Sequence, residues 1–144
     1  MPVRFEMFQA GSVSSDVLWG LVGDLRRLPE WTDVERVADI RPEPVGVGSQ
    51  VETVEAGSMR LWRITTWEPR LYEMRTTTER GEVRFGCRVV RDNRGGSRII
   101  LAAGLHAAGL AGGLRARLLD GPALRRRMDD WARHAVRVAA ASAG

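Results

Sequence analysis

Three side chains are the candidates for proton transfer to or from a ligand: Glu55, Tyr72 and His106. A carboxylate or an imidazole can serve as a general base, and the charge of an imidazole changes close to neutral pH. Tyr72 is the only tyrosine, and its hydroxyl can donate to or accept from a ligand oxygen. The sequence contains no convincing acid–base pair, so a catalytic role for any of the three depends on the elements that position them.

Alternation along the expected strands predicts where two of these side chains point. In Ser97–His106 it places Leu105 toward the interior and His106 outward, unless a bulge intervenes. In Leu71–Glu79 it places Tyr72 inward. The tyrosine is therefore the better placed of the two for contact with an interior ligand.

Glu55 has two interpretations. It shares a strand face with Val51 and Thr53, so it can project into the rim of an interior cavity, where a carboxylate could anchor a ligand or carry a proton. It can equally lie at the surface of an edge strand. We favour the surface position.

The sequence contains no pattern for a metal or an organic cofactor. Cys87 is the only cysteine, which excludes an internal disulfide and a cysteine-cluster metal site, and we expect a buried, inert thiol. The two histidines do not occur at the spacing of a zinc motif. Without a lysine there is neither a Schiff-base nor a P-loop lysine. We therefore expect neither a metal nor a cofactor.

Charge and hydropathy argue against two classes of partner. The formal net charge is +4 and all 22 basic residues are arginine, but Asp and Glu are interleaved with them, so no basic stripe for nucleic acid forms. No run of about 18 apolar residues exists, so we expect no integral membrane segment. The N-terminus lacks the basic and apolar regions of a signal peptide, so we expect a cytoplasmic protein. Both a monomer and a homodimer fit the sequence.

Hydrophobic periodicity predicts one strand, two short helices, six further strands and a long helix. Short helices are predicted over Asp16–Asp24, capped by Ser14 or Ser15, and over Leu25–Trp31. Ala107–Leu119 is ambiguous, and we interpret it as a loop passing into a first helical segment. Period-two alternation between Pro- and Gly-rich breaks predicts the strands Pro2–Gln9, Val34–Arg41, Ser49–Glu55, Met59–Trp67, Leu71–Glu79, Glu82–Arg91 and Ser97–His106.

The long helix over Gly121–Ala141 is expected to cover the sheet. Short connections between consecutive strands make the sheet antiparallel, and its apolar face needs a cover. We therefore predict an α+β fold, a single domain over residues 1–144, with a curved seven-stranded sheet wrapped around this helix. Because a bent sheet cannot lie flush on a cylinder, a cavity remains between them. The helix offers it an apolar stripe of Leu124, Met128, Trp131, Ala135 and Val138.

Four short stretches carry a family resemblance: Val17-Leu18-Trp19 through Asp24 with Leu28-Pro29-Glu30-Trp31, Val47-Gly48-Ser49, Ile64-Thr65-Thr66-Trp67-Glu68-Pro69, and Leu71-Tyr72. They resemble the helix-grip superfamily that includes START-like, Bet v 1-like and polyketide cyclase/dehydrase proteins. The resemblance implies the same fold over nearly the whole chain. It does not select an activity, because the superfamily includes cyclases, aromatases, lipid carriers, hormone receptors and chaperone activators.

Aromatic residues occur in segments that this fold would bring around one cavity. Aromatic walls with a few polar tips suit flat, apolar ligands such as polyketides, sterols or isoprenoids. In Met59–Trp67 we favour Trp62 and Ile64 over Arg63 as the inward set. The predicted ligand-binding residues are Trp31, Trp62, Trp67, Tyr72, Met74, Phe85, Leu101, Met128 and Trp131.

The expected function is the binding of a hydrophobic small molecule in this cavity, in a protein similar to polyketide cyclases/dehydrases. The alternative is a non-catalytic carrier or sensor of a lipid, quinone or isoprenoid. The resemblance favours the first, and the missing acid–base pair favours the second. Whether the protein is an enzyme stays open at this point.

Overall fold

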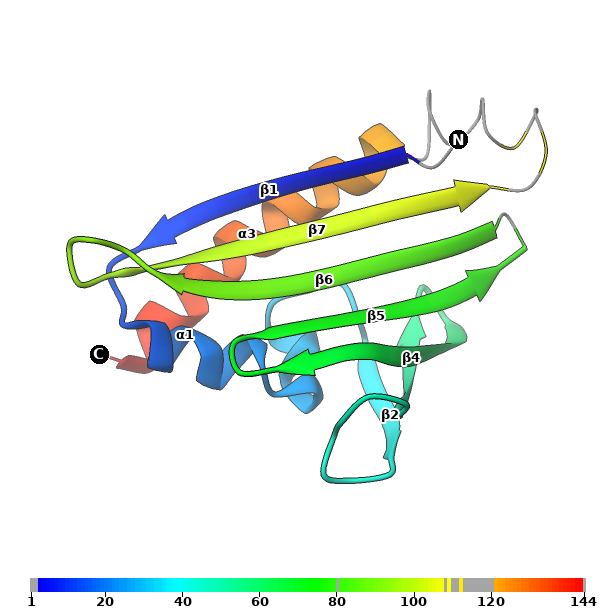
Figure 1. The fold of residues 1–144 in the computed structure, drawn as a ribbon, viewed down its shortest axis with the longest axis horizontal. Coiled ribbons are helices and arrows are strands. Elements are labelled where there is room, and N and C mark those ends of the chain that lie inside the picture. The colour runs from blue at the N-terminus through cyan, green and yellow to red at the C-terminus, as the bar shows by residue number, and fades with distance from the viewer. Residues whose placement is uncertain (1–2, 80, 108, 110–111, 113–120, 144) are drawn as a thin grey trace.

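The computed structural model describes residues 3–79, 81–107, 109, 112 and 121–143, and it contains one antiparallel sheet of seven strands. The strands follow the spatial order β1-β7-β6-β5-β4-β3-β2 (Figure 1). Two short helices, α1 (Ser15–Val22) and the 3₁₀ helix η1 (Leu25–Glu30), lie between β1 and β2, and α3 (Gly121–Ala143) ends the chain. The strand bounds are β1 Val3–Gly11, β2 Arg36–Arg41, β3 Gln50–Glu55, β4 Ser58–Glu68, β5 Leu71–Thr78, β6 Gly81–Arg91 and β7 Ser97–Ala107.

This architecture confirms the predicted fold class. For the observed strands and helices, every predicted boundary lies within two residues of the observed one. The predicted segment Ala107–Leu119 lies, apart from residues 107, 109 and 112, outside the described residues. Among the described residues, no helix is long and apolar enough to cross a membrane.

Local side-chain hydrogen bonds begin and end the short helices. The Ser14 hydroxyl accepts from the backbone N–H of Val17 at 3.2 Å, so Ser14 is the N-cap of α1. An N-cap of this type is worth about 1 kcal/mol. After η1, the Thr32 hydroxyl donates to the Leu28 carbonyl at 2.7 Å and accepts from the Val34 N–H at 3.2 Å. Because this turn uses the Val34 N–H, β2 begins two residues later than predicted.

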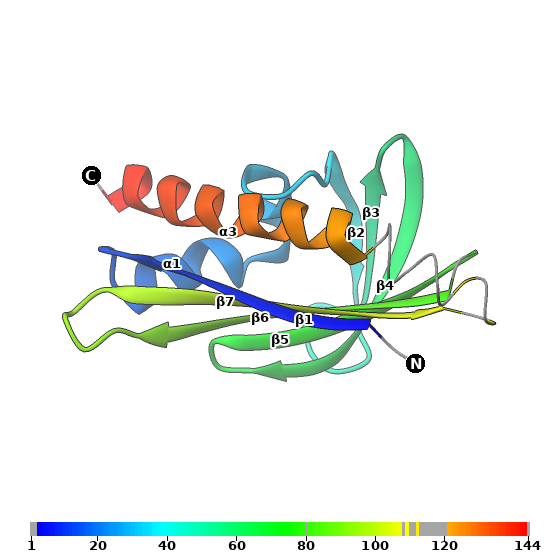
Figure 2. The same cartoon turned by 90° about the horizontal axis from the view of Figure 1, so that it is seen from above.

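The long helix lies across one face of the sheet and packs against β1, β7 and α1 (Figure 2). The β2–β3–β4 end of the sheet bends up beside the N-terminal end of α3 (Figure 2). The short helices α1 and η1 occupy the same face as α3. The interior is therefore filled from one end by α1 and bounded at the other by the bend.

The buried face of α3 is rotated from the predicted stripe. The fully buried side chains are Met128, Ala132, Ala135 and Ala139, at the three- and four-residue steps of one helix face. The predicted members Leu124, Trp131 and Val138 are only half-buried. Alanines on the contact face let α3 approach its neighbours closely. The larger side chains beside this face, such as Leu124 and Trp131, then lie over the space that remains between α3 and the sheet.

The sheet directs its alternate residues inward as predicted, with one irregularity. Trp62 and Ile64 of β4 are buried and Arg63 is exposed, which confirms the preferred face. Strict alternation from Ile64 would turn Trp67 outward. A bulge between Ile64 and Thr66 shifts the register by one residue, so that Trp67 lies directly opposite Tyr72.

Candidate functional site

A small, partly enclosed cavity of about 60 Å³ lies between the bent end of the sheet and the N-terminal half of α3. Most of its lining is apolar. From the sheet it takes Thr53, Glu55, Arg60, Trp62, Met74, Val83, Arg84, Phe85 and Ala103; from the η1–β2 connection Leu28, Thr32 and Val34; and from α3 Leu124, Arg127 and Trp131.

An open basin of about 1180 Å³ adjoins this cavity. We call it the outer basin. Arg60, Val83, Leu124 and Arg127 line both spaces, so the two lie side by side. The rest of its lining comes from Gln50, Ser58, Met59, Leu61, Arg63, Arg75, Thr76, Thr77, Thr78, Glu79, Glu82, Leu105 and Ala123.

Four predicted ligand-binding residues, Trp62, Met74, Phe85 and Trp131, line the cavity. The other five, Trp31, Trp67, Tyr72, Leu101 and Met128, are not among the described residues that line it. Four of these five are fully buried, and Trp67 is half-buried. The structure thus places about half of the predicted set around the hollow part of the interior.

The Glu55 carboxylate faces the cavity, contrary to the surface position we favoured. Its side chain is only 15% exposed. Oε2 accepts hydrogen bonds from Thr53 Oγ1 at 2.6 Å and from Trp62 Nε1 at 3.1 Å, and Oε1 lies 3.5 Å from a guanidinium nitrogen of Arg60. Two hydrogen bonds to Oε2 and one ion pair at Oε1 therefore hold this carboxylate in one orientation.

A chain of aromatic rings fills the interior beside the cavity. Trp19 of α1 lies 6.4 Å from Trp67 and 6.1 Å from Tyr72, measured between ring centroids. Trp67 stacks on Tyr72 at 5.8 Å, and Tyr72 lies 6.4 Å from Phe85. Such pairs add about 0.5–1.5 kcal/mol beyond the burial of area. Trp19, Trp67 and Tyr72 therefore belong to the core, and Phe85 is the ring of this series that lines the cavity.

Trp19 was not among the predicted site residues. It lies on α1, next to the buried Leu18. No sequence pattern pairs it with the β4–β5 corner, because the contact depends on how α1 crosses the sheet.

Tyr72 and Cys87 are neighbours on adjacent strands, directly opposite each other in β5 and β6. Burial raises the pKa of the Cys87 thiol from 9.0 to about 12. Burial also raises the pKa of Tyr72 well above its usual value, and the adjacent thiol raises it further. The Tyr72 hydroxyl has no partner that meets hydrogen-bond geometry among the described residues. Both groups are therefore held neutral in the core, as expected for the thiol.

Trp31, Leu101 and Met128 are completely buried. The indole N–H of Trp31 has no hydrogen-bond partner among the described residues. A buried donor of this kind is usually satisfied by an internal water or a ligand atom.

His106 is exposed at the end of β7 opposite Glu82, while Leu105 lines the outer basin. The alternation that predicted an outward histidine is confirmed, and no bulge turns the imidazole inward. His106 is thus not placed to act on a ligand in the cavity.

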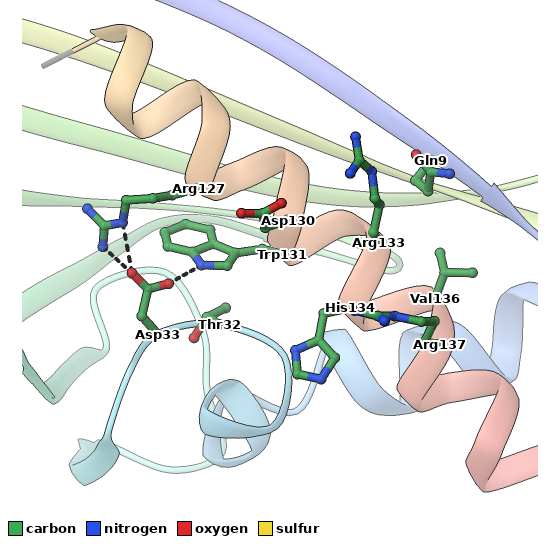
Figure 3. Close-up of a pocket in the computed structure, with 10 residues that line it drawn as sticks. All are labelled: Gln9, Thr32, Asp33, Arg127, Asp130, Trp131, Arg133, His134, Val136 and Arg137. Carbon is green, nitrogen blue, oxygen red and sulfur yellow. Dashed lines mark hydrogen bonds and ion pairs between the residues drawn. The ribbon is translucent and has the colours of Figure 1, made fainter. Parts of the chain in front are cut away.

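A polar contact that the sequence did not predict holds two of the α3 side chains that line the cavity. Asp33, after η1, accepts from Arg127 Nε at 2.8 Å and also from Trp131 Nε1 (Figure 3). The Arg127 guanidinium lies 5.3 Å from the centre of the Trp131 ring. Asp33 therefore fixes two α3 side chains that line the cavity. The partners are 94 and 98 residues apart, so no local spacing signals them.

Truncation of Glu55 is expected to destabilise the fold. Glu55→Ala leaves the Trp62 indole N–H and the Thr53 hydroxyl without their acceptor, and an unsatisfied buried donor costs about 1–3 kcal/mol. The measurement is the free energy of unfolding in urea. Glu52→Ala on the same strand is the matched control, because Glu52 only pairs with the exposed Arg41 and should change stability by less than about 0.5 kcal/mol. Equal effects of the two variants would contradict the buried role of Glu55.

Stability is expected to fall in alkaline solution. Below about pH 9 the Cys87 thiol and the Tyr72 phenol are neutral in both the folded and the unfolded chain, and their contribution to the free energy of unfolding is fully present. Above it the unfolded chain loses these protons while the folded chain retains them. The free energy of unfolding therefore falls between about pH 9 and 12, by up to about 1.4 kcal/mol per pH unit for each group.

Urea unfolding at pH 8, 9, 10 and 11 measures this loss. Cys87→Ala should show a shallower fall, because only the tyrosine then contributes. A stability that stays level or rises with pH over this range would contradict the burial of the two groups.

No protein-family model matches the sequence, and no curated protein matches it. Solved structures with the same fold do exist. Ara h 8.0201 aligns with a TM-score of 0.72 at 17% identity, over 98% of this chain and 99% of that one. The Zhui aromatase/cyclase from a Streptomyces species aligns with a TM-score of 0.73 at 15% identity, over 96% of this chain and 94% of that one. The chain therefore shares its fold with Ara h 8.0201 and with the Zhui aromatase/cyclase.

Proposed function

We propose that the protein binds a hydrophobic small molecule between the bent end of the sheet and α3. The observation that supports this best is the partly enclosed cavity, whose lining is mainly aromatic and aliphatic and includes one oriented carboxylate, that of Glu55. Ligand sites combine these two properties, because apolar walls provide affinity and a few fixed polar groups provide orientation. The fold it shares with an aromatase/cyclase agrees with this proposal.

The volume of the cavity limits what it can hold as it stands. About 60 Å³ accommodates one or two water molecules, whereas sites for organic ligands measure about 300–1,000 Å³. The ligand therefore extends from the cavity into the adjoining outer basin. Leu124 is a half-buried side chain of α3 that borders both spaces, and its rotation would enlarge the cavity without a change in the sheet.

For the reaction, we propose cyclisation or dehydration of a polyketide-like chain, with Glu55 as the base. In such a step the carboxylate takes a proton from a carbon between two carbonyls, and the resulting enolate attacks a third carbonyl to form a ring. The alkoxide then regains a proton, and water leaves on dehydration. Oε2 already accepts two hydrogen bonds, so Oε1 is the oxygen with remaining acceptor capacity. The walls supply the proximity that such a cyclisation requires.

The second candidate is a carrier or sensor of a lipid, quinone or isoprenoid that carries out no chemistry. The specific observation that favours it is the position of the other two candidate residues. Tyr72 is sealed in the core and His106 is exposed, so neither provides an acid to complement Glu55.

Filling the cavity is expected to weaken binding. Ala103 lines the cavity, so Ala103→Leu places three further carbon atoms in it. The affinity for a neutral apolar dye, N-phenyl-1-naphthylamine, should fall at least about tenfold, or about 1.4 kcal/mol. Ala102→Leu is the matched control, since Ala102 lies next in β7, on the opposite face, and does not line the cavity. Equal affinities of the two variants would contradict this location, and no binding by the wild type would contradict the function.

Turnover separates the two candidates. A poly-β-ketone thioester is incubated with the wild type and with Glu55→Gln, and its ring products are measured by mass spectrometry. An enzyme of the proposed type should form products that Glu55→Gln reduces at least about a hundredfold, while dye affinity stays within about threefold. A wild type that binds the thioester without product supports the carrier and contradicts the role of Glu55 as a base.

A further inference from the structure

The sheet is split between β4 and β5. These strands pair from Glu68 opposite Leu71 to Arg63 opposite Arg75, and their pairing ends there. Beyond this point β4 continues to Ser58 alongside β3, while β5 continues to Thr78 alongside β6. The split coincides with the bend seen in Figure 2, where the β3–β4 hairpin turns away from the flatter part of the sheet.

The outer basin lies at this split and leads inward. Residues 58–61 and Arg63 of β4 line one side of it, and residues 75–79 line the other. One hydrogen bond crosses between the strands, from the Thr76 hydroxyl to the Leu61 carbonyl at 2.7 Å. Since Arg60 and Leu124 border both the basin and the cavity, the split lies next to the interior space.

Arginines outnumber glutamates among the described residues that line the split. Four arginines, Arg60, Arg63, Arg75 and Arg127, line the basin against two glutamates, Glu79 and Glu82. Arg60 pairs with Glu55 and Arg127 with Asp33, and both carboxylates belong to the walls already described.

Arg63 and Arg75 form the last cross-strand pair before the split. Like charges directly opposite each other destabilise a sheet. Nearby carboxylates offset this repulsion only slightly. Arg75 lies 3.9 Å from Glu82, and, among the described residues, Arg63 has no ion-pair partner. An anion between the two guanidinium groups would remove this repulsion and gain directed hydrogen bonds from both.

Apolar side chains lie beside these arginines. Met59 and Leu61 of β4 are 58% and 47% exposed, which makes them two of the few large apolar residues at the surface of the described chain. Both line the outer basin. The surface at the split therefore combines cationic groups with an apolar path to the interior.

From this combination we propose that the ligand is an anionic amphiphile, with a carboxylate or phosphate head bound between Arg63 and Arg75. Its apolar chain passes Met59 and Leu61, enters through the split and ends in the cavity. The inference rests on the proposed function, because the apolar chain of the ligand occupies the cavity that the proposed function assigns to it. It adds the class of ligand and the route by which the ligand enters.

Three probes with the same alkyl chain test this inference: dodecanoate, dodecyl phosphate and dodecanol. The binding of each is measured by displacement of N-phenyl-1-naphthylamine from the full-length protein. The two anions should bind at least about tenfold more tightly than the alcohol. Arg63→Gln and Arg75→Gln should each weaken anion binding about tenfold and leave dodecanol within about twofold. Arg88→Gln, an exposed arginine on β6 outside the basin, should change none of the three affinities. The tighter-binding anion identifies the head group as carboxylate or phosphate.

A stability measurement excludes unfolding as the cause of lost affinity. Without ligand, Arg63→Gln removes a repulsion, so its denaturation midpoint in urea should equal or exceed that of the wild type. A lower midpoint would contradict the claim that Arg63 and Arg75 repel each other without compensation.

The remaining outcomes distinguish this inference from the proposed function. If the dye and the alcohol bind but the anions show no preference, the assigned ligand class is wrong and the cavity proposal stands. If the preference persists in both arginine variants, the head group is not bound at Arg63 and Arg75. If neither the dye nor any of the three probes binds, the proposed function fails, and this inference fails with it.

Discussion

The close packing of α3 on one side of a strongly bent sheet determines the rest of the structure. Alanines 132, 135 and 139 and Met128 bring the helix close to its neighbours, and burying a side chain such as Met128 contributes about 1.5–3 kcal/mol. A straight helix that is in close contact at one end cannot follow a sheet that bends away at the other. The space left at the β3–β4 end is where the cavity and the outer basin lie.

Polar groups occur in this space only where the fold supplies their partners. Glu55 is acceptable in an apolar wall because Thr53, Trp62 and Arg60 surround it. On the opposite wall, Asp33 holds Arg127 and Trp131. The same principle explains why Tyr72 and Cys87, which lack charged partners, are held neutral in the core.

Much of the fold could be predicted from the sequence because alternation and helical spacing are local properties. Seven strands, both short helices and the inward faces of Tyr72 and Trp62 follow from them. The position of Trp67 also depended on a bulge, and the buried face of α3 depended on how closely it packs against β1. These are tertiary effects, which no local pattern contains.

The candidate site was predicted less completely, for the same reason. Trp62, Met74, Phe85 and Trp131 were found because large apolar side chains on inward faces must lie in the interior. Glu55 was assigned to the wrong side, because the prediction assumed an edge strand. In the structure β2 forms the edge of the sheet, and Trp62 of β4 donates to the Glu55 carboxylate. The pairing of Asp33 with Arg127 and the split at Arg63 are contacts between distant segments, so the sequence alone could not reveal them.

The central claim is that ligand occupies the space between the bent sheet and α3, and the five tryptophans allow a direct test of it. Their indole N–H signals in a ¹H–¹⁵N NMR spectrum, assigned by single Trp→Phe variants, are followed during titration with dodecanoate. Trp62 and Trp131 line the cavity, so their signals should shift most, while those of Trp19 and Trp31 in the core should shift little. Large shifts at Trp19 or Trp31 with unchanged Trp62 and Trp131 signals would contradict the account.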